Sequence, residues 1–231
     1  YTDYGVNIQK KFFGHFLKGE DTGWKDEPKV RLQVRHPGEV FVEREENEWP
    51  LARTEWTKFY LDPARQTLGK EPPAQAGSAT YAGFGDGVTF LPPPLEAATE
   101  LTGPSAAKLF VSSETEDADL FLVVRIFTGD LKEVVFQGAL DPHTPIAQGW
   151  LRASHRKLDP NLTTEIRPYH THDEIQPLKP GERVECDVEI WDTSIVVPAG
   201  HRIGLTVRGK DYEFTGGAGA GLSNMKNAFT G

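Results

Sequence analysis

The chain has 231 residues, of which 38% are hydrophobic, and a formal net charge of −9. This length supports one substantial core, and an acidic surface repels phosphate backbones and anionic lipids, so neither nucleic acid nor a membrane surface is an expected partner. No run reaches the roughly 18 apolar residues that a membrane-spanning helix needs. The single cysteine, Cys186, excludes an internal disulfide, and its alternating apolar surroundings predict an inert buried thiol in a cytoplasmic protein.

The first predicted element is an amphipathic helix over residues 4–18. Its apolar side chains recur at spacings of one, three and four and share one stripe: Ile8, Phe12, Phe13, Phe16 and Leu17. Lys18 in the last turn and Gly19 directly after it favour a helix end at that point. The aromatic stripe needs a surface to pack on, so we expect this helix to dock on another part of the protein.

From residue 30 onward the hydrophobic period changes from 3.6 to 2, which is typical of strands. This alternation, together with continuous apolar runs between turn-forming residues, predicts strands over residues 30–35, 55–61, 107–112, 120–127, 132–137, 149–158, 163–167, 183–191 and 201–208, with short ones at 79–82 and 88–91. Residues 120–124 are apolar on both faces and predict a central, fully covered strand. The glycine-rich residues 215–221 predict no regular structure. One helix followed by many strands indicates a mainly β fold, an antiparallel jelly-roll sandwich.

The sequence offers no convincing nucleophile. It has no Gly-x-Ser-x-Gly elbow, the strained turn that exposes a hydrolase serine. Ser154 and His155 are adjacent on a predicted strand, where neighbouring side chains point to opposite faces, so they are not expected to form a nucleophile–base pair. Arg152 and Arg156 flank them and predict an anchor for a neighbouring strand or domain. Ser105 follows a proline in an incomplete elbow, so no residue of this chain is predicted to be catalytic.

The sequence also contains residues of the types that form metal and sugar sites. The run His170 to Asp173 supplies too few ligands for a structural zinc site and predicts a polar loop. The acidic residues of 114–119 lack calcium-loop spacing and predict a solvated turn, so we expect no metal and no cofactor. Trp24, Trp49 and Trp150 leave open a sugar-stacking platform, against the alternative that they are core or interface residues.

A series of short motifs, in fixed order along the chain, resembles a known family. The motifs include Phe12-Phe13-Gly14-His15-Phe16-Leu17-Lys18-Gly19, Trp49-Pro50, Asp117-Ala118-Asp119, Gly149-Trp150-Leu151-Arg152-Ala153-Ser154-His155-Arg156, Lys179-Pro180-Gly181-Glu182 and Ala199-Gly200-His201-Arg202. Together they resemble the C-terminal part of the CocE/NonD hydrolases, which are related to X-prolyl dipeptidyl peptidases, cocaine esterase and α-amino-acid ester hydrolases. Gly14 departs from the acidic residue expected in the family's helix.

The resemblance implies a three-part enzyme: an α/β-hydrolase domain with a Ser-Asp-His triad, a helical cap, and a jelly roll of the galactose-binding-like type that packs on both. Residues 1–27 would be the last hydrolase helix and a linker, and residues 28–231 a jelly roll truncated at its C-terminus. The triad would lie before Tyr1, which leaves this piece inactive by itself. The whole protein would cleave a small ester or amide substrate through an acyl-enzyme, as an esterase, an acylase or a dipeptidyl peptidase.

Two alternatives stay open. One is a non-catalytic jelly roll that binds carbohydrate through exposed tryptophans. The other is a structural interaction domain whose aromatic helix docks on a partner, including a second copy of the chain in a homo-oligomer.

Overall fold

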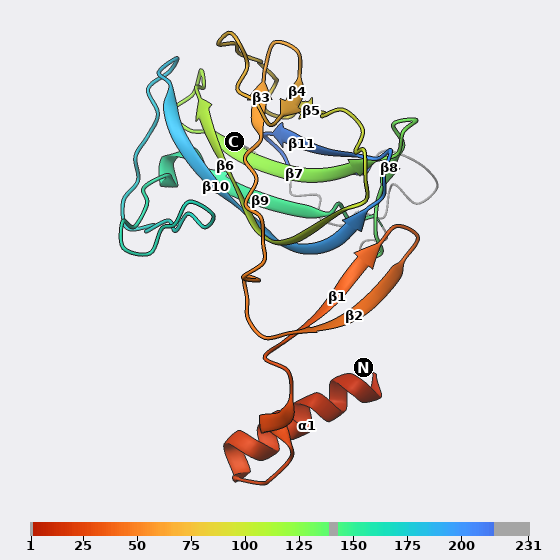
Figure 1. Cartoon of the computed structure of the whole chain (residues 1–231). Helices are drawn as coiled ribbons and strands as arrows, with labels where there is room; N and C mark the ends of the chain where they lie inside the picture. The colour runs from red at the N-terminus through yellow and green to blue at the C-terminus, as the bar shows by residue number, and fades with distance from the viewer. Residues whose placement is uncertain (1, 139–142, 215–231) are drawn as a thin grey trace.

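The computed structural model describes residues 2–138 and 143–214 and shows one helix followed by a β-sandwich (Figure 1). One sheet has the order β2 (Val40–Glu46), β1 (Val30–His36), β10 (Val184–Val197), β6 (Thr99–Val111). The other has the order β5 (Val88–Phe90), β11 (Arg202–Arg208), β7 (Asp119–Phe127), β8 (Glu133–Val134), with β9 (Ala147–Arg152) also paired to β7. A small ribbon joins β3 (Tyr60–Asp62) to β4 (Thr67–Gly69), and the helical elements are α1 (Asp3–Lys18), η1 (Trp24–Asp26) and η2 (Ala153–His155). The predicted fold class is confirmed.

The core lies between the two sheets. Along β10 the inward side chains Cys186, Val188 and Ile190 are buried and join a cluster that includes Leu122 of β7 and Leu151 of β9. Burial raises the pKa of the Cys186 thiol to about 11, because a thiolate is poorly solvated there. The thiol is therefore protonated and inert at neutral pH, as its alternating surroundings predict.

The two sheets meet at one edge, where β9 lies against β10. Although β9 is hydrogen-bonded to β7, its Gly149 faces the β10 backbone so closely that an added Cβ would lie 2.1 Å from the Glu189 carbonyl oxygen. Only glycine allows this approach, since any side chain would collide with main-chain atoms. We call this contact the seam; it closes one side of the sandwich.

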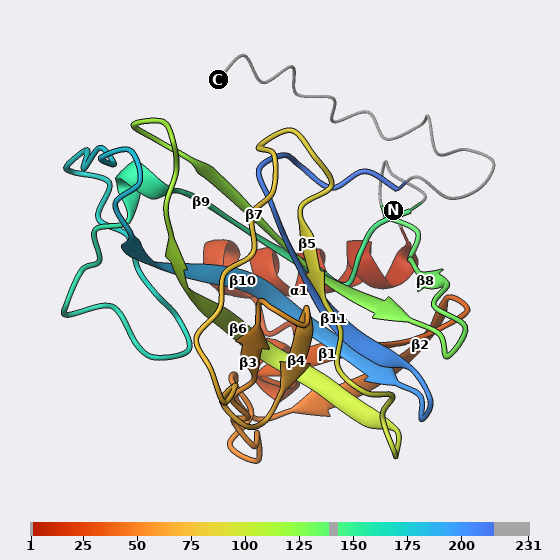
Figure 2. The same cartoon turned by 90° about the horizontal axis from the view of Figure 1, so that it is seen from above.

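The N-terminal elements form an extension that we call the arm: α1, η1 and the β1–β2 hairpin. Figures 1 and 2 place α1 beneath the two sheets, with the hairpin between the helix and the sandwich. Strand β1 joins its sheet through a parallel pairing with β10 at Arg35 and Ile195. The half-buried Arg35 guanidinium strengthens this junction, because its Nη2 donates to the Ile146 carbonyl at 2.9 Å and to Thr193 Oγ1 at 2.8 Å.

Within the arm, polar contacts fix the helix relative to the hairpin. Thr2 caps the helix by accepting from the Gly5 amide, and Gly19 ends it in the left-handed conformation. Glu27 accepts from Lys11 of α1 at 2.5 Å and pairs with Arg31 of β1 at 3.3 Å. The Lys11 ammonium lowers the pKa of Glu27, so the link is ionised at neutral pH.

Gly14 also has a local explanation. A Cβ at this position would lie 2.8 Å from side-chain atoms of Glu20 and Thr22, which fold back over the last turns of α1. The departure from the expected acidic residue therefore accompanies a close return of the chain after the helix.

Several strand predictions are wrong. Residues 55–59 are mostly exposed and form no strand, so the predicted strand 55–61 is reduced to β3. Residues 79–82 form no strand, and residues 163–167 form a turn in which Thr164 and Arg167 exchange backbone hydrogen bonds. The predicted strand 149–158 ends at Arg152, and 132–137 contains only the short β8. Strand β2 was not predicted, and the tail 215–221 lies outside the described residues.

Replacing Gly149 by alanine should destabilise the chain by about 1–3 kcal/mol, because the new methyl group forces β9 away from β10. Gly129→Ala is the matched control, since its Cβ would lie 3.5 Å from the nearest atom, an ordinary contact. Urea unfolding of both variants measures the difference. Equal stability of the two would show that the seam carries no packing constraint.

The ion pair between Glu100 and Arg44 makes the stability of the chain depend on pH in the acidic range. Glu100 of β6 accepts from both Nη atoms of Arg44 of β2, at 2.7 and 2.8 Å, and this lowers its pKa from 4.5 to about 2. A lowered folded-state pKa stabilises above pH 4.5, and that stabilisation is lost as the pH falls from 4.5 toward 2. The pair is partly exposed, so we expect less than about 1 kcal/mol.

Thermal unfolding of Glu100→Gln should therefore differ from the unsubstituted chain at pH 6 and approach it at pH 2.5. The exposed Glu114→Gln variant should show no such trend. A Glu100→Gln difference that is constant over this range would contradict the assignment.

Candidate functional site

The serine and histidine that the sequence places side by side lie in η2, not on a strand. Strand β9 ends at Arg152, and the Ala153 amide then donates to the Ala118 carbonyl at 2.8 Å, which turns the chain. Ser154 is only 2% exposed, and its Oγ donates to Asp117 Oδ2 at 2.6 Å. Its amide donates to Asp117 Oδ1 at 2.9 Å. The hydroxyl thus donates to a carboxylate and not to an imidazole that would remove its proton. Ser154 and His155 form no nucleophile–base pair, as the sequence predicts, but the reason is this hydrogen bond and not the alternation of side chains along a strand.

The neighbouring arginines fasten the same corner. Arg152 donates to both carboxylate oxygens of Asp119 on β7, at 2.8 and 2.9 Å. Arg156 donates to the Ala153 carbonyl at 3.0 Å and to the Gln176 carbonyl at 2.5 Å. Arg152 therefore anchors a neighbouring strand, as predicted, while Arg156 holds the returning end of the long loop between η2 and β10. Asp117 and Asp119, predicted as part of a solvated turn, are acceptors within this network.

The histidines of the long loop meet His155. The Nδ1 atoms of His155 and His172 lie 3.2 Å apart, and the rings of His170 and His172 are 6.0 Å apart between centroids. Burial lowers the pKa of His170, which favours its neutral form. Asp173 accepts hydrogen bonds from Lys157 Nζ at 3.1 Å and from Thr171 Oγ1 at 2.5 Å. Within residues 2–138 and 143–214, no group of three or more His, Cys, Asp or Glu side chains is arranged to hold a metal ion.

The three tryptophans that the sequence offers as a sugar-stacking platform, Trp24, Trp49 and Trp150, lie in three different environments. Trp24 packs edge-on against Phe12, with 5.1 Å between centroids, and the Trp49 indole donates to Asp192 at 2.7 Å. Trp150 of β9 instead pairs across the seam with Trp191 of β10, in a T-shaped contact at 4.9 Å. Sequence reasoning missed Trp191 as a surface residue because it ends an alternating run whose other members are structural.

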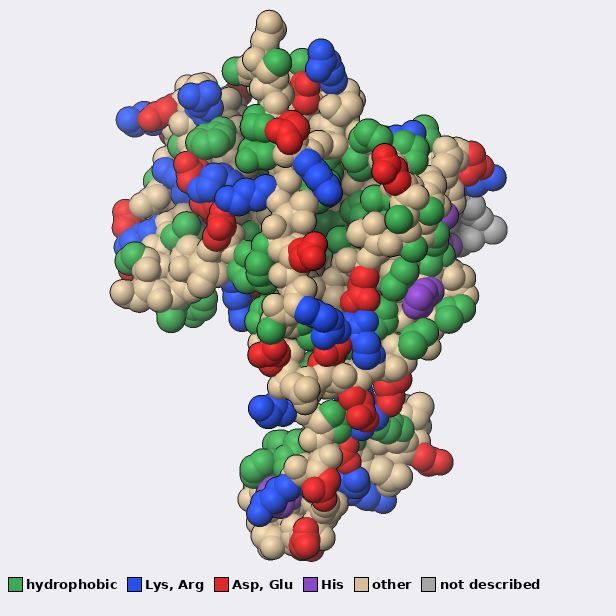
Figure 3. Space-filling model, viewed as in Figure 1, with side chains coloured by type: hydrophobic (Ala, Val, Ile, Leu, Met, Phe, Trp, Pro, Cys, Tyr) green, Lys and Arg blue, Asp and Glu red, His purple; other side chains and the backbone are tan. Residues whose placement is uncertain are grey.

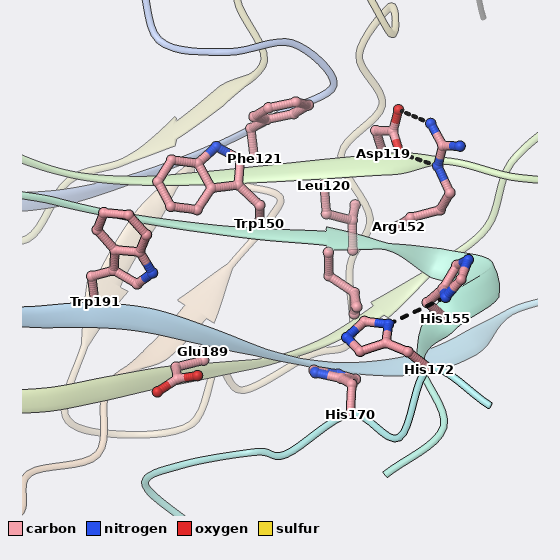
Figure 4. A pocket seen from close by; sticks show the side chains of 11 residues that line it. Asp119, Leu120, Phe121, Trp150, Arg152, His155, His170, His172, Glu189 and Trp191 are labelled. Carbon is pink, nitrogen blue, oxygen red and sulfur yellow. Dashed lines mark hydrogen bonds and ion pairs between the residues drawn. The ribbon is translucent and has the colours of Figure 1, made fainter. Parts of the chain in front are cut away.

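A hollow of about 450 Å³ lies over the seam. It is lined by Asp119, Leu120, Phe121, Trp150, Leu151, Arg152, His155, His170, His172, Glu189 and Trp191 (Figure 4). Ser105 does not line it; Ser105 lies on β6, where it pairs with Ile190 of β10.

The arm carries a group of exposed apolar side chains. Phe16 is 57% exposed and Leu17 76% exposed, and Phe12 and Phe13 lie beside them on α1. The hairpin adds Val40, Phe41 and Val42, about half of each exposed. Figure 3 shows hydrophobic side chains at the surface of this lower part of the molecule. No helix among the described residues is both long enough and apolar enough to span a membrane.

Known proteins resemble this chain in sequence and in structure. The family described as the X-Pro dipeptidyl-peptidase C-terminal non-catalytic domain matches residues 22–224. This chain belongs to that family. Membership confirms the resemblance that the ordered motifs indicate, and it fits the absence of a serine–imidazole pair around Ser154.

Relatives of this non-catalytic domain are parts of longer proteins. A CocE/NonD family hydrolase from Staphylococcus aureus has a structure that superposes with a TM-score of 0.85 at 28% identity, covering 98% of this chain and 41% of that protein. A provisionally named serine esterase of Mycobacterium bovis is 27% identical, covering 87% of this chain and 35% of the relative. The cocaine esterase of a Rhodococcus species is 25% identical, covering 90% and 38%. The chain thus spans between about a third and two fifths of these relatives.

Removing the Ser154 hydroxyl should cost stability. Ser154→Ala takes a buried donor from Asp117, and we expect a loss of about 1–3 kcal/mol in the free energy of unfolding. The exposed Ser112→Ala variant is the control and should stay within about 0.5 kcal/mol of the unsubstituted chain. Equal stability of both variants in urea unfolding would contradict a structural role for this hydroxyl.

Proposed function

We propose that this chain is the non-catalytic sandwich of a serine hydrolase of the CocE/NonD type, which cleaves small ester or amide substrates through an acyl-enzyme. In this proposal residues 1–27 complete the hydrolase domain and link it to the jelly roll of residues 28–231. The jelly roll holds the hydrolase and cap domains in place. A cytoplasmic location remains a prediction from the single cysteine, Cys186.

The observation that carries the proposal is the exposed aromatic face of α1. Burying a fully exposed Phe or Leu side chain is worth about 1.5–3 kcal/mol, and α1 presents several such side chains together, between 39% and 76% exposed, whose burial would yield a part of this each. A patch of this kind marks an interaction surface. We assign it to the hydrolase domain of the same protein, because more than half of each relative's length lies outside the matched region.

The arm is suited to this role by the way it is attached. The ionic link from Lys11 through Glu27 to Arg31 ties the helix to the hairpin, while Arg35 ties the hairpin to both sheets. A domain seated on α1 would therefore be held at a fixed angle to the sandwich. The chain contributes positioning, and the nucleophile, base and oxyanion donors belong to the hydrolase domain.

The test compares the isolated chain with the whole protein that carries it. Leu17→Ser should change the stability of the isolated chain by less than about 0.5 kcal/mol, because this side chain is 76% exposed there. In the whole protein the same variant should lower the unfolding midpoint and the rate of p-nitrophenyl acetate hydrolysis. Lys18→Ser, at a similarly exposed polar position, is the control and should do neither.

A fluorophosphonate probe supplies the chemical half of the experiment. It should label one serine of the whole protein outside residues 1–231 and leave the isolated chain unlabelled. Labelling of Ser154 or Ser105, or equal effects of Leu17→Ser and Lys18→Ser in the whole protein, would refute the proposal.

A further inference from the structure

The hollow over the seam has an aromatic side and a polar side. Figure 4 shows Phe121, Trp150 and Trp191 toward one side, and His155 and His172 with the Asp119–Arg152 pair toward the other. Trp191 is 65% exposed and stands nearly perpendicular to Trp150, at an interplanar angle of 72°. Because Trp191 remains largely exposed beside Trp150, indole surface is available to a flat apolar side of a ligand.

The charges around the hollow are paired. Arg152 neutralises Asp119 through two hydrogen bonds, and Arg167 lies 3.2 Å from Glu189. His170 is held toward its neutral form by burial. A cationic ligand would need an unpaired carboxylate and an anionic one an unpaired guanidinium, so the balance favours a neutral ligand.

The polar side nevertheless keeps hydrogen-bonding capacity. His155 and His172 face each other through Nδ1, which leaves the Nε2 atom of each ring for another partner. Figure 4 shows Glu189 below the hollow and the second ring nitrogen of His172 turned toward its centre. Carboxylates that accept from arginine still have free lone pairs. The ligand must therefore offer several hydroxyl or amide groups on one side and C–H groups on the other.

We propose that this hollow binds a neutral sugar ring, with its C–H face against Trp150 and Trp191 and its hydroxyl groups toward Glu189 and His172. A volume of about 450 Å³ lies within the range of small-molecule sites and holds one or two such rings. The site consists wholly of residues of this chain, so it does not depend on hydrolase activity or on any other domain.

The experiment titrates the 231-residue chain with neutral sugars and follows tryptophan fluorescence. The panel contains maltose, cellobiose, lactose and N-acetylglucosamine, with glucosamine and glucuronate as cationic and anionic counterparts. We expect saturable quenching by at least one neutral sugar, with a Kd in the millimolar range or tighter. The charged counterparts should bind more weakly.

Two variants and one matched control locate the binding. Trp191→Ala removes an exposed ring and should weaken binding about tenfold or more. Trp150→Phe should weaken it while keeping an aromatic side chain in the seam. Trp56→Ala, which removes a half-exposed tryptophan that does not line the hollow, should leave the Kd within about twofold.

No saturable binding by any neutral sugar of the panel would overturn the proposal. Binding that survives Trp191→Ala unchanged, or tighter binding of glucosamine or glucuronate, would also overturn it. These outcomes leave the hydrolase proposal untouched, since that is tested on α1 and by serine labelling.

Discussion

The structure depends on one steric constraint, the contact of Gly149 with the β10 backbone. Since no side chain stands between β9 and β10, the edge of one sheet lies against the other and the sandwich closes along the seam. The same approach brings Trp150 next to Trp191, although these residues belong to different sheets. Strand β9 then has to end at once, and the chain turns through η2 into the loop that carries His170 and His172. The hollow results from that closure. So does the hydrogen-bonded group of Asp117, Asp119, Arg152 and Ser154 around η2, which we call the polar corner.

The polar corner shows how residue types common in hydrolase sites can serve a purely structural purpose. Ser154 and His155 of η2 lie close in space to Asp117 and Asp119, yet each is bound to a partner that leaves no reactive arrangement. Asp117 accepts from the Ser154 hydroxyl and amide, and so acts as a bracket for the turn. Such satisfied networks specify a unique local structure. In this chain the Ser154 hydroxyl is therefore held in a structural role by its hydrogen bond to Asp117.

The sequence predicted the elements whose apolar residues form a clear pattern. Strands β10 and β11 were found because their apolar residues alternate and pack in the core, α1 because its apolar residues share one stripe, and β7 because its apolar run is continuous and buried on both faces. Strand β2 escaped because Val40, Phe41 and Val42 are consecutive, exposed and apolar, a pattern set by the protein surface and not by a core. The strand predicted over residues 55–61 failed for a different reason: residues 55–59 carry large aromatic side chains but are exposed and pair with no strand, and only Tyr60 and Leu61 belong to β3.

The candidate site was harder to predict than the fold. Ser154 and His155 were read as strand residues because nothing in their own sequence shows that Ala153 bonds to Ala118 and breaks the extended chain. Pairing Trp150 with Trp191 requires the register of two sheets, which depends on a glycine 40 residues away from Glu189 in sequence. Local patterns do not carry such long-range contacts. The family likeness, by contrast, rests on the order of motifs and needs no register.

The attachment of β1 to β10 has a thermodynamic consequence. A hairpin that shares a single register pair with its sheet, supported by Arg35 and a few side-chain contacts, has few backbone hydrogen bonds to break before it opens locally. Its amide protons should exchange through opening events that leave β7 and β11 closed. Order in the N-terminal segment is then governed by whatever occupies α1, so that docking and local folding become one coupled equilibrium.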